Sequence, residues 1–354
     1  MPAHYENIAG PAAEALDSLT PAQTAFIRSL PKAELHAHLN GSIPIATLRQ
    51  LAHEQSQSDQ APVQLPSDAR DGFARLLSNT GVELTEIGDF FGLFPAIYAL
   101  TSAPETLRKA ARAVLETFLE GEHPQCAYIE LRSTPRATSA MSREDYVRAV
   151  LDEVERYAPE QAAMIVSLDR KMEEAVMEEC VGVAVKQRGE GRRVVGIDLC
   201  GDPRAGDMDI LARHVKRAKE AGLGVTLHIA ETVENTDSET LKLLSYGPDR
   251  LGHATFLNDE AKAFVLEKKT CVELCLSSNL LCKTVPTLDD HHITFYLKHD
   301  HPIVICTDDI LPFRNSLLGE YALLMAAPPL GLGLGEDAVR RIAEMGMEAR
   351  FRSP

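Results

Sequence analysis

The sequence lacks tryptophan, is poor in aromatic side chains (5%), and has fewer basic than acidic residues. Its 36 Lys and Arg residues against 52 Asp and Glu residues give a formal net charge of −16. A protein that binds a nucleic-acid polymer needs clustered basic side chains to displace counterions, so this charge argues against that class of partner. A small anionic ligand stays compatible with the composition, because one or two local donors can hold it.

Long apolar runs are also missing. The longest apolar stretch, residues 321–334, is interrupted by two prolines and two glycines, whereas a membrane-spanning helix needs about 20 apolar residues. The N-terminal segment has neither the basic start nor the apolar block of a secretory signal. The seven cysteines are scattered and form no CxxC pair, which is typical of thiols in a reducing compartment. We therefore expect a soluble cytoplasmic enzyme, a monomer with no membrane partner.

Eight short apolar segments rich in β-branched residues alternate with segments of helical spacing. Their continuous apolar character predicts strands that are buried on both faces. The predicted strands are residues 33–39, 126–132, 163–168, 193–199, 223–228, 249–253, 270–276 and 302–307. Helical patterns follow at residues 107–118, 143–157, 173–186, 205–221, 238–244, 260–268, 287–298 and 336–350, and Ser102 with Glu105 predicts a capping box before the first of them. This alternation favours an α/β fold, a (β/α)₈ TIM barrel, over an open sheet.

Two segments lie outside the alternation within what we expect to be one domain, residues 1–354. Residues 1–30 are predicted to form a helical lead-in, with Pro21 near a helix start. Residues 41–103 form a helical insertion after the first strand, in which the polar segment 54–70 is expected to be loose. An insertion at the mouth of a barrel is well placed to cover a substrate as a lid.

Polar or ionisable residues stand at the carboxyl end of every predicted strand. A polar residue that begins a loop is the ordinary explanation for any single strand. In a barrel, however, all eight ends meet at one mouth, where the chemistry of this fold takes place. The end residues are His36 and His38, Arg132, Asp169, Asp202, His228, His253, Ser277 with Asn279, and Asp308 with Asp309.

Three histidines and one aspartate in this set are suited to bind a metal ion. His36 and His38 are two apart on a strand and project to the same face, while His228 and Asp308 end the fifth and eighth strands. Alone, such a histidine pair is a weak signal, and an Asp pair before a helix is equally typical of an N-cap. Together they fit a divalent ion such as Zn²⁺ with one position left for water. Binuclear barrel hydrolases usually place a bridging lysine on the fourth strand, and residues 199–202 have none, so we expect one zinc ion per chain.

Two further residues are placed to assist hydrolysis. A zinc ion lowers the pKa of its bound water to ~7, and the reaction then needs a proton donor and a group that orients the water. Glu231, three residues after His228, is placed to be the donor, and His253 is placed to orient or deprotonate the water. For His253, a structural role as a buried histidine is the alternative.

Five motifs occur in a characteristic order. The segments PKAELHAHLNGSI (31–43), IDLCGDP (197–203), LHIAE (227–231), RLGHA (250–254) and CTDD (306–309) together resemble the adenosine/AMP deaminase family, whose fold is a barrel of the metal-dependent hydrolase type. The resemblance extends over roughly residues 30–325. HLNGS (38–42), ELRSTPR (130–136) and LTSAPE (100–105) make the chain most similar to the adenosine deaminase-like branch, which hydrolyses N6-methyl-AMP.

The resemblance implies a role for each matching residue. Zinc would be held by His36, His38, His228 and Asp308. Glu231 would protonate the purine N1, and His253 would assist the attacking hydroxide. Substrate would be contacted by His38, Asn40, Tyr98, Thr134, Pro135, Arg136, Asp169, Gly201 and Asp309, with Asp309 bonding the purine ring and the Gly201 backbone facing its N3 edge.

The choice between nucleoside and nucleotide depends on fewer residues. Adenosine deaminases proper have an acid where this chain has Asn40, and a neutral amide removes repulsion against a 5′-phosphate. Thr134 and Arg136 could donate hydrogen bonds to that phosphate. Alternatively, Asn40 is a turn former and Arg136 a surface residue. Tyr98 stands where the branch usually has histidine, which leaves selectivity on the amine side open.

The predicted function is therefore hydrolysis of N6-methyl-AMP, an N6-substituted purine nucleotide, to IMP and methylamine by a zinc-dependent aminohydrolase. Adenosine or 2′-deoxyadenosine deamination on the same residues is one alternative. A metal-binding or signalling barrel without activity is another, and the presence of both Glu231 and His253 argues against it.

Overall fold

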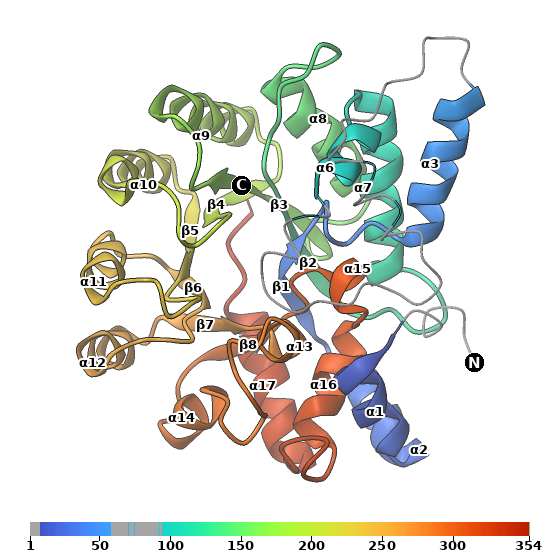
Figure 1. The fold of residues 1–354 in the computed structure, drawn as a ribbon, viewed down its shortest axis with the longest axis vertical. Helices are drawn as coiled ribbons and strands as arrows, with labels where there is room; N and C mark the ends of the chain where they lie inside the picture. The colour runs from blue at the N-terminus through green and yellow to red at the C-terminus, as the bar shows by residue number, and fades with distance from the viewer. Residues whose placement is uncertain (1–7, 58–69, 71–73, 75–91, 93, 354) are drawn as a thin grey trace.

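The computed structural model describes residues 8–57, 70, 74, 92 and 94–353, and its centre is one parallel sheet of eight strands in the order β1 to β8 (Figure 1). Each strand lies within three residues of a predicted one at either end, so the predicted α/β barrel is confirmed. The strands are β1 (Ala33–His38), β2 (Tyr128–Ser133), β3 (Ala162–Asp169), β4 (Val194–Cys200), β5 (Gly224–Ile229), β6 (Arg250–His253), β7 (Cys271–Leu274) and β8 (Ile303–Ile305).

The barrel closes between β8 and β1 just beyond the end of β8. Ala37 and Asp308 form an isolated parallel bridge. The Asp308 N–H donates to the carbonyl of His36 at 2.8 Å, and the His38 N–H donates to the carbonyl of Asp308 at 3.0 Å. The backbone that joins the two strands is therefore the same backbone that carries three of the predicted site residues.

Helices surround the strands (Figure 1), and most of them agree with the sequence patterns. These are α7 (Pro104–Leu119), α8 (Arg143–Val154), α9 (Glu174–Gly189), α10 (Leu211–Glu220), α11 (Asp237–Ser245), α12 (Asp259–Lys268), α14 (Ile293–Lys298) and α17 (Glu336–Glu348). The predicted capping box before α7 is wrong, because Ala103 is the N-cap and no side chain caps the helix. The seventh strand ends at Leu274, and Ser277 and Asn279 lie in the short helix α13 (Leu276–Leu281) instead.

The lead-in and the insertion each contain helices in the part that the structure describes. The lead-in contains α1 (Gly10–Ser18) and α2 (Pro21–Ser29), the latter with a capping box between Thr20 and Gln23. The insertion contains α3 (Ile45–Gln57) and α6 (Phe94–Leu100). Residues 54–57 of the polar segment belong to α3, and most of the remainder of that segment lies outside the described residues.

Two helices follow β8 that the sequence patterns did not single out. The short α15 (Ile310–Phe313) is followed by α16 (Leu317–Met325), in which every residue is buried. A helix that is buried on all sides has no amphipathic period, and for this reason α16 escaped the helical pattern. The α16 helix packs against α1 and α2, so the lead-in covers it. Among the described residues, no helix is long and apolar enough to cross a bilayer.

Candidate active site

A cavity of about 270 Å³ opens at the carboxyl ends of the strands, beside α6. It brings together most of the predicted site residues, as the barrel geometry requires. Three predicted site residues, His36, Pro135 and Arg136, are not among its lining residues. The predicted residues that line it are His38, Asn40, Tyr98, Thr134, Asp169, Gly201, His228, Glu231, His253, Asp308 and Asp309.

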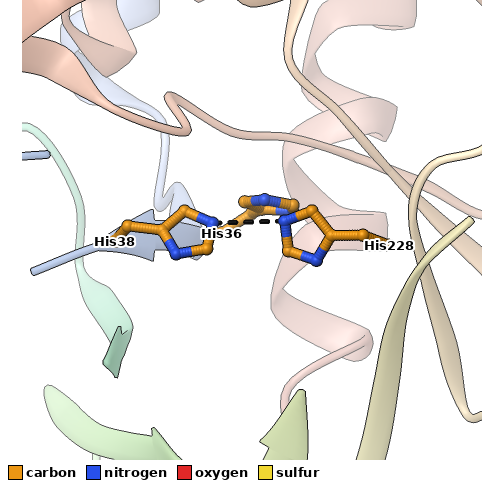
Figure 2. A group of neighbouring side chains, drawn as sticks. All are labelled: His36, His38 and His228. Atoms are coloured by element: carbon orange, nitrogen blue, oxygen red, sulfur yellow. Dashed lines mark hydrogen bonds between the residues drawn. The ribbon is translucent and has the colours of Figure 1, made fainter. Parts of the chain in front are cut away.

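The rings of His36, His38 and His228 lie close together and face one another (Figure 2). The Nε2 atoms of His38 and His228 are 3.2 Å apart, and the buried Nε2 of His36 has no hydrogen-bond partner. Asp308 Oδ1 lies 3.6 Å from Nε2 of both His36 and His38. Two nitrogens bound tetrahedrally to one ion at about 2.0–2.1 Å stand roughly 3.3 Å apart. The cluster therefore fits a metal ion, and one ligand atom from each histidine lies within 4.8 Å of the other two.

Two buried carboxylates orient these rings from below. His36 Nδ1 donates to Glu273 Oε2 at 2.7 Å, and His228 Nδ1 donates to Asp198 Oδ1 at 3.0 Å. Because a carboxylate only accepts, both rings carry their proton on Nδ1 and direct the Nε2 lone pair toward the cluster. Burial alone would raise the pKa of Glu273, but Arg132 and Arg250 hold it at about 2.

The sequence analysis missed Glu273 and Asp198 as site residues. Both stand inside predicted apolar strands, and both are fully buried. A charged residue within an otherwise apolar strand was the available signal, since burying such a group requires a partner.

Glu231 and His253 face each other beside the cluster. His253 Nε2 lies 3.9 Å from Glu231 Oε1, and only 2% and 14% of their side chains are exposed. Burial raises the pKa of Glu231 to about 7, so a proton is held there near neutral pH. Burial and then His228 lower the pKa of His253 well below its usual value, so its ring is neutral. The pair thus offers one proton donor and one proton acceptor at the same end of the cavity.

Left-handed backbone occurs at three of these strand ends. Ala230, His253 and Asp308 have φ values of 47°, 60° and 63°. Such conformations cost about 1–3 kcal/mol each for residues other than glycine, and they tend to cluster at functional sites. The His253 carbonyl is also fixed by a hydrogen bond of 2.8 Å from His292 Nε2.

Asp309 lies directly over Gly41. A Cβ atom on Gly41 would be 1.4 Å from Asp309 Oδ1, so only glycine leaves room for this carboxyl group. Asp309 is the N-cap residue of α15 by position, yet its side chain makes no capping hydrogen bond. Burial and the adjacent Asp308 raise the pKa of Asp309 well above its usual range. A protonated carboxyl group can donate a hydrogen bond into the cavity.

Asn40 contacts uncharged side chains in the cavity wall. Asn40 Nδ2 donates to the Tyr146 hydroxyl at 3.2 Å, and that hydroxyl is 2.7 Å from Ser133 Oγ. Asn40 Oδ1 is buried without a hydrogen-bond partner. Thr134 Oγ1 contacts Cys200 Sγ at 3.6 Å on the same wall.

Lys171 also lines the cavity, and the sequence analysis did not identify it. Its side chain is 64% exposed, and Nζ lies 3.3 Å from Asp202 Oδ2. The Lys171 backbone N–H donates to Asp169 Oδ1 at 2.8 Å. Gly201 stands opposite with φ +97°, and a Cβ there would be 2.8 Å from the Asp169 carboxyl group. The close approach of Asp169 therefore requires glycine at position 201.

Arg136 contacts α6 instead of the cavity. Its Nη1 donates to the carbonyl of Tyr98 at 3.2 Å, and its Nη2 donates to Thr101 Oγ1 at 2.8 Å. The guanidinium carbon lies 4.2 Å from the centre of the Tyr98 ring, a cation–π contact. Arg136 thereby holds Tyr98 at the cavity rim.

The fold and the histidine–carboxylate site define a TIM barrel of the metal-dependent hydrolase class. The family model described as adenosine deaminase matches residues 31–353. The chain also shares 35% identity with the N6-methyl-AMP deaminase of Homo sapiens, over 86% of this chain and 84% of that protein. The chain therefore belongs to the adenosine deaminase family.

Solved structures agree with this assignment. The apo N6-methyl-AMP deaminase from Arabidopsis thaliana superposes with a TM-score of 0.79 at 31% identity, covering 93% of this chain and 94% of that one. Arabidopsis ADAL complexed with IMP gives a TM-score of 0.80 at 31% identity, covering 92% and 94%.

Proposed function

We propose that this protein is a zinc-dependent aminohydrolase that converts N6-methyl-AMP and water to IMP and methylamine. The observation that carries the proposal is the histidine cluster beside Glu231, whose pKa burial raises to about 7, and the neutral His253, in a cavity where position 40 is an amide and not an acid. Relatives named N6-methyl-AMP deaminase support the substrate, and the Arabidopsis complex with IMP supports the product.

One zinc ion per chain would be held by His36, His38, His228 and Asp308. The unpartnered Nε2 of His36 and the fixed Nδ1 protons of His36 and His228 suit a cation at that point. When bound, the ion supplies a Lewis acid that lowers the pKa of water to about 7. The borderline-soft imidazole donors with one carboxylate favour zinc over magnesium or calcium, which prefer oxygen ligands.

Glu231 and His253 carry the proton transfers. Glu231 donates its proton to the purine N1, which makes C6 electrophilic. His253, neutral and 3.9 Å away, takes the proton of the water that adds to C6. The bond between C6 and the exocyclic nitrogen then breaks, and methylamine leaves with a proton.

The purine and ribose are positioned by the surrounding wall. Asp309 donates through its retained proton to a ring nitrogen, and the Gly201 N–H faces N3. His38 and Asp169 border the ribose side of the cavity. The family resemblance implies these assignments, and the lining of the cavity and the raised pKa of Asp309 support them.

The 5′-phosphate lies against Asn40, Thr134 and Lys171. Because the Tyr146 hydroxyl can donate or accept, the Asn40 amide can reverse and direct its NH₂ group toward a phosphate. Pro135 does not line the cavity, and Arg136 acts indirectly, since it holds Tyr98 and α6 at the cavity rim. In this proposal residues 41–103 are a lid-like insertion of a single barrel domain, and the protein acts as a monomer in the cytoplasm, in keeping with its seven free cysteines.

A side-by-side measurement of kcat/KM for N6-methyl-AMP, AMP and adenosine tests this function. We expect N6-methyl-AMP to have the highest value. Faster turnover of adenosine would refute the nucleotide proposal and support nucleoside deamination. If zinc-loaded protein turns over none of the three substrates, the result would support the alternative of a metal-binding barrel without this activity.

A further inference from the structure

Arg132 on β2 lies inside the barrel, where it is 0% exposed and is among the residues that line the cavity. Its Nη2 donates to Glu273 Oε2 on β7 at 2.9 Å and to the carbonyl of Leu35. Its Nη1 forms an ion pair with Asp198 Oδ1 on β4 at 3.4 Å, without hydrogen-bond geometry. One guanidinium group thus contacts carboxylates from two strands, neither of which is a neighbour of β2.

Those two carboxylates are the ones that orient His36 and His228. Glu273 Oε2, which accepts from Arg132, also accepts from His36 Nδ1. Asp198 Oδ1, which faces Arg132, also accepts from His228 Nδ1. The Arg132 guanidinium group is therefore linked to the His36 ring through Glu273 and to the His228 ring through Asp198.

We propose that Arg132 is a positioning residue for the metal centre. Its planar fork holds Glu273 and Asp198 at a fixed separation and, through them, holds the rings of His36 and His228 where one ion can bind both. The inference rests on the proposed zinc site.

The buried charges explain why this position needs arginine. Asp198 also accepts a hydrogen bond from Ser167 Oγ at 3.0 Å, but that hydroxyl carries no charge. Arg132 supplies the positive charge beside the Asp198 carboxylate. A lysine ammonium is a compact charge on a flexible stem, and it does not reproduce two contacts in a fixed plane. With lysine, one carboxylate loses its partner and the ring above it loses its orientation.

Arg250 provides a matched control. It is 1% exposed and also bonds Glu273, with Nε donating to Oε1 at 2.7 Å. Its remaining contacts face the base of the barrel, where Nη2 donates to Glu130 Oε2 at 2.6 Å and the Phe351 ring lies 3.6 Å from its guanidinium carbon. Arg250 therefore matches Arg132 in burial, charge and bonding to Glu273, but it acts from the opposite side.

The test measures the zinc Kd of the wild type, Arg132→Lys and Arg250→Lys by competition with a chromophoric chelator. Circular dichroism and thermal melting of the metal-free proteins check that each variant is folded. Loss of a group that orients metal ligands typically weakens metal binding about 10–100-fold, and we expect this loss for Arg132→Lys. Arg250→Lys should raise the Kd by a clearly smaller factor. Equal factors for both variants, or no change for Arg132→Lys, would overturn the inference.

A second comparison tests whether Arg132 acts through Asp198. In an Asp198→Asn background, Arg132→Lys should raise the zinc Kd by a smaller factor than in the wild type, because the carboxylate that it holds is already gone. An unchanged factor would indicate general loosening of the barrel and would contradict a positioning role. If Arg132→Lys and a second variant, Arg132→Gln, both fail to fold, Arg132 belongs to the stability of the fold and the inference is overturned.

The wild-type measurement separates the two levels of the proposal. A wild-type chain that binds no zinc would refute the proposed metal site whatever the variants do. A wild-type chain that binds zinc, with an Arg132→Lys variant that binds it equally well, would refute only the role of Arg132.

Discussion

Replacing Asn40 by aspartate tests the nucleotide specificity most directly. Asn40 is only 5% exposed, and it lies on the cavity wall assigned to the phosphate. The fold should tolerate the change, since the Tyr146 hydroxyl can turn to donate to a carboxylate in place of accepting from the amide. The new negative charge then faces the phosphate of the substrate.

The expected magnitude follows from Coulomb's law. Two unit charges about 6 Å apart in an effective dielectric of about 20 repel each other by ~3 kcal/mol, which corresponds to roughly a 100-fold loss in binding. A phosphate near pH 7 carries more than one negative charge, so ~3 kcal/mol is a lower limit of the repulsion. Nucleosides carry no such charge and should be little affected.

The assay compares kcat/KM for N6-methyl-AMP and N6-methyladenosine in the wild type, Asn40→Asp and Asn40→Ser. Asn40→Ser removes the amide without adding charge and should lose far less on the nucleotide than Asn40→Asp does. Equal losses on both substrates for Asn40→Asp would show that position 40 acts on the purine or on the fold, and the electrostatic reasoning would be wrong.

Four further outcomes are expected. Glu231→Gln should lower kcat by about 10²–10⁴-fold, the usual contribution of a general acid, while metal analysis still finds zinc; near-normal turnover would assign the donor elsewhere. Because burial raises the pKa of Glu231 to about 7, its acid form is lost as the pH rises, and kcat/KM should fall above pH 7 in a pH–rate profile; a constant value to high pH would contradict this. Removing zinc with a chelator should lower the thermal midpoint, since the proposed ligands join β1, β5 and the segment just after β8, and added zinc should restore it; an unchanged midpoint would argue against these residues as ligands. Lys171→Met should raise KM for the nucleotide alone, whereas Arg136→Ala should raise KM for nucleotide and nucleoside alike through Tyr98; a nucleotide-only effect of Arg136→Ala would indicate direct phosphate contact.

The strands could be predicted because each is a continuous apolar run, and the mouth of the barrel could be predicted because a polar residue follows each run. The histidines of the cluster were found for the same reason, since their spacing and their strand ends are visible along the chain. The sequence motif that contains Arg136 could also be recognised, but the hydrogen bonds of Arg136 to Tyr98 and Thr101 depend on where α6 packs. No local pattern reports that position.

The pairing of the charged residues inside the barrel could not be predicted from the sequence, for a physical reason. Arg132 and Glu273 are 141 residues apart in sequence, and the strands that carry them are not adjacent in the sheet. A charged residue within an apolar strand shows that a partner must exist, but only the closed barrel determines which one. The α16 helix was missed for a different reason. All of its residues are buried, so its sequence has no amphipathic period to detect.

The seam between β1 and β8 has a consequence for the order of events during synthesis and folding. His36 and His38 are made early, whereas Asp308 comes after all eight strands, and the backbone of these residues closes the barrel. The complete proposed ligand set therefore comes together only when the last strand pairs with the first. An incompletely folded chain would have an incomplete metal centre and could not hydrolyse nucleotide. Catalytic activity would therefore indicate that the barrel has closed.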